Sequence, residues 1–332
     1  MKAITVRKYG SPYKVFQLSE VEKPAPEDHQ VLIKVRAAAV NPADYQLSRG
    51  DIRIATGFFK PNISWLGYDV AGEVEAVGKN VNRFKPGDEV YGICTRSPNT
   101  GSQASWLYDF GCFAEYTLSH EDALALKPSN LTFEQAAAVP CTGLVALQGL
   151  WAGGIQAGQT VLISSATGGI GTFAVQIAKA LGVEVTGVCN TKNMELVRSI
   201  GADRVIDYTR EKYTRQGQRY DIVFDSIGDH KLSEIKRILN PGGKVVIVSA
   251  RKGNANKYIK IITRVMAASI LPYVTKDASK PSGSDLQVIS GFIADGKVSP
   301  VIEKTFTGLS NVPQAIQYVY SGHAWGKVVV II

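Results

Sequence analysis

The chain has 332 residues, a length typical of two domains and long enough to bury a large core without disulfide or metal staples. Hydrophobic residues make up 45% and charged residues 20%, with 32 Gly and 14 Pro, which excludes a disordered, collagen-like or coiled-coil chain. The 37 Lys and Arg against 29 Asp and Glu give a net charge of +8, but the basic residues form no cluster along the chain. We therefore expect a solvated basic surface and no specific nucleic-acid site; any nucleic-acid binding would be secondary and salt-sensitive.

The cysteines and the first residues indicate the compartment. The four cysteines form no CxxC pair and are too sparse for a secreted disulfide scaffold: Cys94, Cys112, Cys141 and Cys189. The first ten residues lack the apolar core of a signal peptide. The longest apolar stretch, 259–274, is interrupted by two basic residues and a proline, so no membrane span is expected. The sequence predicts a cytoplasmic protein.

The first third of the chain predicts β-structure. Short segments rich in Val, Ile, Ala and Tyr are separated by Gly and Pro, a pattern typical of a partly open barrel or sandwich. The predicted strands are 2–6, 15–20, 31–38, 70–78 and 88–93.

From residue 129 the pattern becomes helical, and from residue 159 strands alternate with helices. Thr132 and Gln135 form a capping box for a helix that Pro140 interrupts, and a second helix is predicted over 142–151. Alternation of strands and helices predicts an α/β fold with a doubly wound parallel sheet. The expected strands are 161–165, 183–188, 204–207, 221–225, 243–249, 300–306 and 327–332, and the expected helices 170–181, 193–200, 230–239, 285–295 and 311–320.

A glycine motif lies between the strand at 161–165 and the helix that follows it. The spacing of Ala166, Gly168 and Gly171 fits the dinucleotide motif GxGxxG with alanine in the first place. Glycine at these places permits close approach of a pyrophosphate and close packing of helix on strand, and the helix N-terminus offers unpaired N–H groups. The predicted cofactor contacts here are Ala166, Thr167, Gly168, Gly169, Ile170 and Gly171. The alternative is a tight turn that uses glycine for structure alone.

The residues after the next strand favour NADPH over NADH. An NAD site usually has Asp or Glu about 20 residues beyond the glycines, to bind the ribose 2′-OH. This chain has Asn190, Thr191 and Lys192 there, so no carboxylate repels a 2′-phosphate and the lysine can pair with it. Tyr208, at the end of the following strand, is expected beside the adenosine. The alternative is that Lys192 is an ordinary surface lysine.

A series of short motifs covers nearly the whole chain. They are VNPAD at 40–44, GYDVAG at 67–72, FKPGDEVYG at 84–92, AAVPCTG at 137–143, the glycine motif, GAD at 201–203, IDY at 206–208, DSIG at 225–228 and GKVV at 326–329. In this order they resemble the medium-chain dehydrogenase/reductase family, in its zinc-free quinone oxidoreductase branch. The resemblance implies a GroES-like catalytic domain at 1–123 and 277–332 and a Rossmann domain at 124–276. It also implies hydride transfer in the cleft between the domains, and a homodimer.

The resemblance also assigns the site residues. Asn41, Tyr45 and Tyr68 are implied at the nicotinamide end as catalytic donors, with Asp44 as a brace for a loop. Further residues are implied to bind the cofactor: Thr142, Ser226, Ile227, Ser249 and Lys327. The loop 95–112 is longer than in compact members of the family and carries Trp106, Tyr108 and Phe110. These aromatic residues either cover an apolar substrate pocket, or pack in a dimer interface or against the side of their own domain.

Zinc is not expected. The zinc-dependent alcohol dehydrogenases of this family have metal ligands at the places of Asn41, Tyr68 and Ala138, and none of these three side chains is a good zinc ligand. The lobe with four closely spaced cysteines that binds a structural zinc is also missing.

Without a Lewis acid, the expected reaction is reduction of a quinone or an α,β-unsaturated carbonyl, with hydrogen-bond donors stabilising the negative charge that forms on oxygen. One alternative is a catalytically weak NADPH-binding sensor or structural protein of the same fold. A peripheral membrane protein is another alternative, although the sequence has no basic amphipathic helix.

Overall fold

The computed structural model describes residues 1–51, 57–61, 65–95, 111–228, 230–248, 271–276, 280–322 and 324–332. The chain divides into two compact units. Unit 1 comprises Met1–Cys141, Lys280–Ala294 and Pro300–Ile332, and unit 2 comprises Thr142–Ser279 and Asp295–Ser299. The predicted domain boundaries at 123/124 and 276/277 stay a prediction. Ser249 and the three aromatic residues of the 95–112 loop lie outside the described residues.

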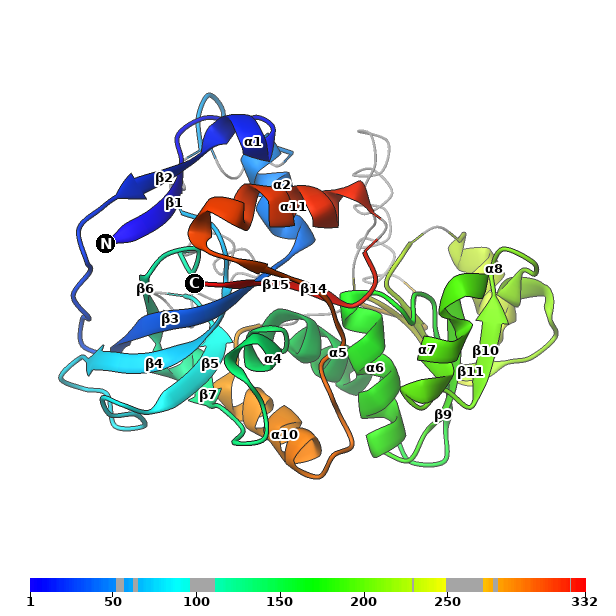
Figure 1. Ribbon diagram of the computed structural model, residues 1–332. Helices are drawn as coiled ribbons and strands as arrows, with labels where there is room; N and C mark the ends of the chain where they lie inside the picture. The colour runs from blue at the N-terminus through cyan, green and yellow to red at the C-terminus, as the bar shows by residue number, and fades with distance from the viewer. Residues whose placement is uncertain are drawn as a thin grey trace. The chain divides into compact units, whose positions relative to one another are not determined.

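Unit 1 is built on a seven-stranded sheet (Figure 1). The strand order is β14-β15-β3-β4-β5-β7, and β6 also pairs with β3. These strands are β3 (Gln30–Val40), β4 (Asp69–Val77), β5 (Glu89–Ile93), β6 (Tyr116–His120), β7 (Leu124–Leu126), β14 (Ile302–Thr307) and β15 (Lys327–Ile331). A separate antiparallel hairpin joins β1 (Lys2–Val6) to β2 (Phe16–Glu20). The helices are α1 (Pro12–Val15), α2 (Pro42–Arg49), α4 (Phe133–Ala137), α10 (Gly283–Ala294) and α11 (Val312–Ser321).

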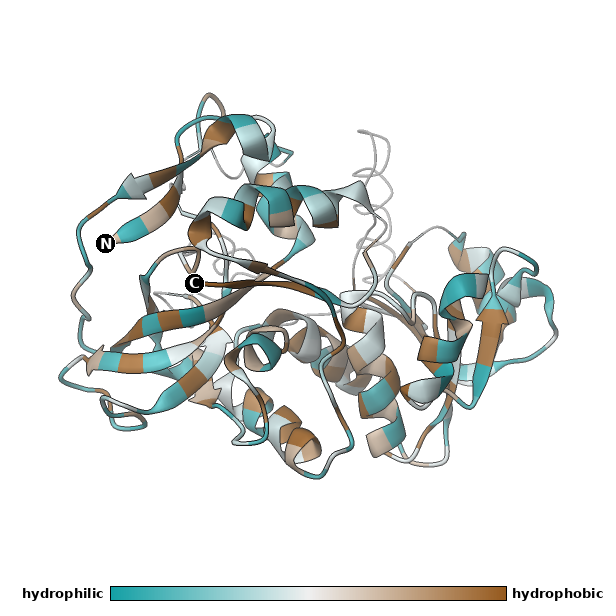
Figure 2. Cartoon of the chain, viewed as in Figure 1, coloured by the Kyte–Doolittle hydropathy of each residue, from teal (hydrophilic) through white to brown (hydrophobic). Residues whose placement is uncertain are grey.

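The register of three neighbouring strands positions the polar residues of unit 1. β15 runs antiparallel to β3 with Val328 opposite Val40, and β3 runs antiparallel to β4 with Ala39 opposite Asp69. The first residue of β15, the residue that follows β3 and the first residue of β4 therefore meet at one end of the sheet. Apolar side chains dominate β15, as its colour in Figure 2 shows, and Val328 to Val330 are buried.

Unit 2 is a doubly wound parallel sheet, which confirms the predicted fold class. The strand order is β10-β9-β8-β11-β12-β13, the 3-2-1-4-5-6 order of a dinucleotide-binding fold. The strands are β8 (Thr160–Ile163), β9 (Glu184–Cys189), β10 (Arg204–Asp207), β11 (Tyr220–Asp225), β12 (Leu239–Ile247) and β13 (Val274–Lys276). The helices are α6 (Gly169–Ala180), α7 (Met194–Ser199) and α8 (Leu232–Arg237), and α5 (Pro140–Ala152) begins in unit 1 and continues into unit 2.

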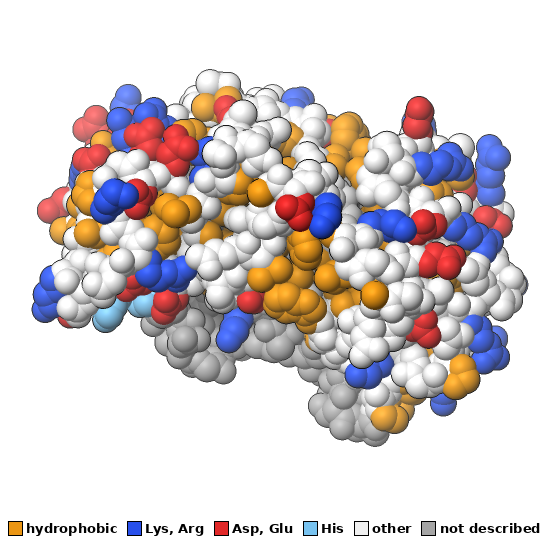
Figure 3. Space-filling model, turned by 90° about the horizontal axis from the view of Figure 1, so that it is seen from below, with side chains coloured by type: hydrophobic (Ala, Val, Ile, Leu, Met, Phe, Trp, Pro, Cys, Tyr) orange, Lys and Arg blue, Asp and Glu red, His pale blue; other side chains and the backbone are white. Residues whose placement is uncertain are grey.

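The surface carries mixed charge. In the face drawn in Figure 3, Lys and Arg side chains are interspersed with Asp and Glu. Exposed ion pairs account for part of this mixture, for example Lys179 with Asp203 at 2.8 Å and Lys79 with Asp28 at 3.1 Å. Within the described residues, no helix is long and apolar enough to cross a membrane.

Candidate functional site

The glycine turn of unit 2 connects β8 to α6. Gly168 is the N-cap residue of α6 in an extended conformation, and its carbonyl accepts the first helical bond from Thr172 N at 2.9 Å. A Cβ on Gly171 would lie 1.7 Å from the carbonyl oxygen of Ser165, so only glycine permits helix and turn to approach this closely. The N–H groups of the first helical turn have no acceptor within the helix. The turn therefore has the geometry of an anion-binding helix N-terminus.

A second loop follows β11 at the same edge of the sheet. The Asp225 carboxylate accepts hydrogen bonds from Ser164 Oγ at 3.2 Å and from the N–H groups of Ile227 at 3.2 Å and Gly228 at 2.9 Å. Ser164 Oγ in turn accepts the N–H of Ser226 at 3.0 Å. These bonds fix the loop that carries Ser226 and Ile227 beside the end of β8.

Two buried polar atoms at this edge have no hydrogen-bond partner among the described residues. They are Asn190 Oδ1, directly after β9, and Ser226 Oγ, directly after β11. Buried polar atoms are nearly always hydrogen-bonded, so an unpaired pair at the carboxyl ends of parallel strands fits a site for a polar ligand. The side chains present thus suit a dinucleotide, whose ribose and phosphate groups can supply the missing partners. Thr142, also predicted here, is buried near the start of α5.

The predicted 2′-phosphate residues lie after β9, in a short 3₁₀ helix over Thr191–Asn193. Lys192 is exposed and pairs with no carboxylate among the described residues. Thr191 Oγ1, in contrast, donates to Asp207 Oδ2 at 2.5 Å, and Thr209 donates to the other oxygen. The Thr191 bond, and then the Thr209 bond, lower the pKa of Asp207 below its ordinary value. Tyr208 follows this carboxylate and is half exposed.

Asp207 is a residue of this region that the sequence reasoning missed. The sequence motif points to the end of β9 as the place for an acid. Asp207 lies instead at the end of the neighbouring strand β10, where it is the pairing partner of Cys189 of β9. A pairing of strands that is known only from the structure brings this carboxylate next to Thr191.

In unit 1, a buried polar network occupies the end of the sheet where β15, β3 and β4 meet. Lys327 Nζ lies 3.0 Å from Asp69 Oδ2 and donates to Asn41 Oδ1 at 2.7 Å. The Asn41 amide donates to the same Asp69 oxygen at 2.9 Å, and the other Asp69 oxygen accepts the N–H of Cys141 at 2.8 Å. The Lys327 and Asp69 side chains are 3% and 0% exposed. The network therefore forms a closed ion pair inside unit 1.

In this network, the side-chain hydrogen-bonding groups of Asn41, which was implied to be a catalytic donor, already have partners. Its Oδ1 accepts from Lys327, and its Nδ2 donates to Asp69 and, at 3.4 Å, to the carbonyl of Ala39. A hydrogen bond from Asn41 to a substrate would require one of these bonds to be given up. Lys327, implied to bind the cofactor, likewise has its ammonium engaged inside unit 1. Both assignments stay predictions.

Asp44 braces the turn before β4, the role that its position predicts. Its carboxylate accepts the N–H of Asn41 at 2.7 Å and the N–H of Gly67 at 3.1 Å. Gly67 has φ of 87°, and a Cβ there would lie 2.6 Å from Cys112 Sγ. Asp44 thus fixes the backbone at Asn41 and, through Gly67, immediately before Tyr68, the two predicted catalytic residues.

Tyr68 and Tyr45 come from different elements of unit 1. Tyr68 precedes β4 and is 2% exposed, and burial raises its pKa well above the ordinary value, so the phenol stays protonated and remains a donor. Tyr45 lies on α2 and stacks on Tyr320 of α11, with ring centroids 3.5 Å apart. Arg49 donates to the hydroxyl of Tyr320 at 3.2 Å. Tyr45 therefore packs toward α11, and Tyr68 is the better placed of the two beside the Asn41 network.

The residues at the zinc-ligand places of the family do not fit a catalytic zinc. Asn41 and Tyr68 are poor donors, and Ala138 has no donor atom. The Lys327 ammonium lies 2.7 Å from Asn41 Oδ1, and a buried cation so close disfavours a second one. Within the described part of the chain, no group of three or more His, Cys, Asp or Glu side chains is arranged to hold a metal ion.

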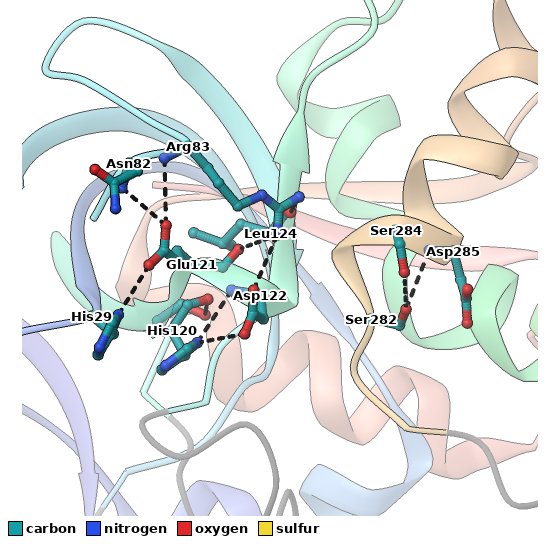
Figure 4. Close-up of polar contacts among 11 residues, drawn as sticks. His29, Asn82, Arg83, His120, Glu121, Asp122, Leu124, Ser282, Ser284 and Asp285 are labelled. Atoms are coloured by element: carbon teal, nitrogen blue, oxygen red, sulfur yellow. Dashed lines mark hydrogen bonds and ion pairs between the residues drawn. The ribbon is translucent and has the colours of Figure 1, made fainter. Parts of the chain in front are cut away.

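A second polar cluster in unit 1 surrounds Glu121 (Figure 4). The Glu121 carboxylate lies 3.1 Å from His29 Nδ1 and accepts the N–H groups of Asn82 and Arg83 at 3.2 and 3.4 Å. Burial acts to raise the pKa of Glu121, but the bond with His29 and the two backbone bonds together outweigh it and lower the pKa below its ordinary value. The three bonds to Glu121 join its short 3₁₀ helix, Glu121–Ala123, to two distant segments of unit 1, which indicates a structural role.

Asp44 predicts a pH dependence of stability. Burial raises its pKa from 3.8 to about 7. Between these two pH values, the native state therefore keeps the Asp44 proton that the unfolded chain has released. This stabilising contribution is present in full below about pH 4 and is lost as the pH rises through about 7. Relative to Asp44→Asn, the wild-type protein should lose about 1.4 kcal/mol of unfolding free energy per pH unit within that window. Urea denaturation of both proteins at several pH values measures the difference; a difference that does not change with pH contradicts the prediction.

Comparison with known proteins places the chain in a family. Residues 27–129 match the alcohol dehydrogenase GroES-like domain, and residues 200–330 match the domain described as zinc-binding dehydrogenase. The chain is 34% identical to the 2-methylene-furan-3-one reductase of Solanum lycopersicum and 35% identical to the chloroplastic NADPH-dependent alkenal/one oxidoreductase of Arabidopsis thaliana. Each match covers 99% of this chain and 79% of the relative.

The solved structure of the quinone oxidoreductase from Coxiella burnetii is similar over the whole chain. The TM-score is 0.82 at 30% identity, and the match covers 100% of this chain and 99% of that one. The predicted resemblance is confirmed by these matches, the strand order of unit 2 and the glycine turn. The chain belongs to the medium-chain dehydrogenase/reductase family, in the branch of the quinone and enone oxidoreductases.

Proposed function

We propose that this protein is an oxidoreductase that uses NADPH to reduce quinones or α,β-unsaturated carbonyls without zinc. The observation that carries the proposal is the edge of the unit 2 sheet, where the glycine turn lies beside the unpaired atoms of Asn190 and Ser226. Relatives named as alkenal/one and quinone oxidoreductases support the substrate class, and the name of one of them supports NADPH.

The residues of unit 2 would hold the cofactor. The N–H groups at the start of α6 suit the pyrophosphate, Asn190 and Ser226 suit ribose hydroxyls, and Lys192 suits the 2′-phosphate. When bound, the nicotinamide supplies a hydride. The chain's share of the reaction is to bind, to orient and to stabilise charge.

In unit 1, Tyr68 is the donor that we propose for the substrate oxygen. Hydride addition to the conjugated carbon leaves an enolate or a hydroquinone anion, and a fixed hydrogen-bond donor stabilises that charge. The raised pKa of Tyr68 keeps its phenol protonated, so that it remains a hydrogen-bond donor. Water can supply the final proton. Asn41, Asp69 and Lys327 then act as positioning residues that keep the backbone next to Tyr68 in place.

Steady-state oxidation of NADPH tests the proposal. Quinones and α,β-enones should be reduced, whereas saturated aldehydes should not, because the side chains at the zinc-ligand places do not suit a Lewis acid that would polarise an isolated carbonyl. The control is oxidation of saturated alcohols with NADP⁺. If alcohol oxidation is faster than reduction of every enone, the mechanism is wrong. Tight NADPH binding without turnover of any acceptor would favour the sensor or structural protein instead.

Metal analysis and chelation test the absence of zinc. The purified protein should hold no stoichiometric zinc and should keep its activity after treatment with a chelator, because Asn41, at one of the ligand places, already accepts a hydrogen bond from the Lys327 ammonium. One tightly held zinc per chain, with activity lost when it is removed, would contradict the prediction.

We further propose a homodimer in the cytoplasm. No disulfide joins any of the four cysteines, which is typical of a reducing compartment. The homodimer follows from the family resemblance. Some relatives are named as chloroplastic or mitochondrial, so fractionation of the native host is the measurement that decides the compartment.

A further inference from the structure

Unit 1 exposes two adjacent phenylalanines. Phe58 is 69% exposed and Phe59 is 92% exposed, and their rings meet edge to face with centroids 5.2 Å apart. Large aromatic side chains are rarely left this open unless they contact a partner. Because Phe59 is 92% exposed, almost none of its ring is enclosed, whereas small-ligand sites enclose most of what they bind; the pair is therefore suited to a surface.

A hydrogen bond joins the phenylalanine segment to the turn between β1 and α1. Tyr9 Oη donates to the carbonyl of Gly57 at 2.6 Å, and Gly10 N donates to Ser48 O of α2 at 2.9 Å. The turn leads into α1, which contacts α2 and α11 (Figure 1) and carries Tyr13, itself 60% exposed. Three exposed aromatic rings thus come from two segments that are tied together.

Basic residues lie next to these aromatic residues in the sequence. Arg7, Lys8, Lys14 and Lys60 are exposed, and none has an ion-pair partner among the described residues. The first 19 residues contain no Asp or Glu. Some other surface lysines of unit 1 are paired, for example Lys23 with Glu75 at 2.6 Å. We call the seven residues the aromatic–basic patch: Arg7, Lys8, Tyr13, Lys14, Phe58, Phe59 and Lys60.

We propose that the aromatic–basic patch docks the protein on the surface of an anionic lipid bilayer. Aromatic rings that project from a surface enter the interfacial region of a membrane, and cations beside them contact the negative headgroups. A single nucleic-acid strand also binds aromatic and basic residues, but it needs open ring faces on which bases stack. The interplanar angle of 80° between Phe58 and Phe59 does not form such a platform. An acidic protein would match the charge but leave the projecting rings without a pocket.

Flotation with lipid vesicles tests the proposal on the full chain without cofactor or substrate. Vesicles of phosphatidylcholine with phosphatidylglycerol should bind the protein, with binding weakened by salt, and vesicles of phosphatidylcholine alone should bind it much less. Lys60→Ala should lower the partition coefficient about fivefold. The double variant Phe58→Ser, Phe59→Ser should lower it at least about tenfold.

Lys212→Ala is the matched control, because Lys212 is an exposed lysine of unit 2 and the change in net charge is the same. It should leave vesicle binding unchanged. Equal losses for Lys60→Ala and Lys212→Ala would overturn the proposal, since net charge alone would then account for binding. So would a lack of binding to anionic vesicles, or binding that the phenylalanine variant does not weaken. Binding of a single-stranded oligonucleotide in place of vesicles would also overturn it.

An activity assay separates this inference from the proposed function. With a small water-soluble enone, kcat/KM should be the same for the wild type and for the double phenylalanine variant. A raised KM with unchanged vesicle binding would assign the rings to the substrate site and overturn the membrane proposal. If the wild-type protein oxidises no NADPH with any acceptor, the proposed function is refuted, whereas the result of the vesicle experiment is unaffected.

Discussion

Replacement of Lys327 by Met should destabilise unit 1 by about 3–5 kcal/mol, because it leaves the Asp69 carboxylate buried without its cation. The remaining bonds to Asp69, from Asn41 and the N–H of Cys141, do not compensate for the missing charge. Thermal and urea unfolding measure the loss. The double variant Lys327→Met, Asp69→Asn removes both charges and should be more stable than the single variant.

Lys127→Met is the matched control for Lys327→Met. Lys127 is also buried and pairs with Glu89 at 3.0 Å, but Glu89 is half exposed and can be hydrated when the lysine is removed. The expected loss for this pair is about 1 kcal/mol, the range of partly exposed ion pairs. If both variants lose the same small amount, the Lys327–Asp69 pair is not the centre of stability that we infer.

Replacement of Lys192 by Ala should weaken NADPH binding about 10- to 100-fold, the range expected for a hydrogen bond to a charged group. The structure sharpens the reason. The hydroxyl of Thr191 is already bonded to Asp207, so we expect the exposed Lys192 to be the main side-chain partner of a 2′-phosphate. Binding of NADH should hardly change, because NADH has no group for the lysine to hold. Titration of both cofactors measures the two affinities.

Lys212→Ala again provides the control, as an exposed lysine of the same unit. It should leave both affinities unchanged. Equal losses for NADPH and NADH in Lys192→Ala would mean that the substitution disturbed the fold of unit 2. No loss for either cofactor would move the 2′-phosphate site away from Lys192.

Local patterns predicted most elements but missed the two helices that begin at Pro12 and Pro42. The break expected at Pro140 is present between α4 and α5, but the second helix begins at Pro140 itself and not at residue 142. Proline lacks an N–H and has a fixed φ, which suits the first helical position as well as it disrupts an interior one. A pattern of hydrophobic residues alone does not separate the two cases in helices as short as α1.

Contacts between distant segments could not be predicted from local sequence patterns. Asn41, Asp69 and Lys327 are of ordinary residue types, and the last is 258 positions from Asp69. Only the registers of β15 on β3 and of β3 on β4 bring them together. The glycine turn, in contrast, was predictable, because its chemistry depends on consecutive residues between one strand and one helix.

The place of β15 in its sheet has a consequence for synthesis of the chain. β15 lies between β14 and β3, and it is translated after the whole of unit 2. The ribosome therefore releases the contiguous segment 142–279 while unit 1 still has an open edge at β3 and an unneutralised Asp69. Open strand edges pair readily with other chains. During synthesis, the half-built first sheet is therefore the part of the nascent chain that we expect to be most open to such pairing.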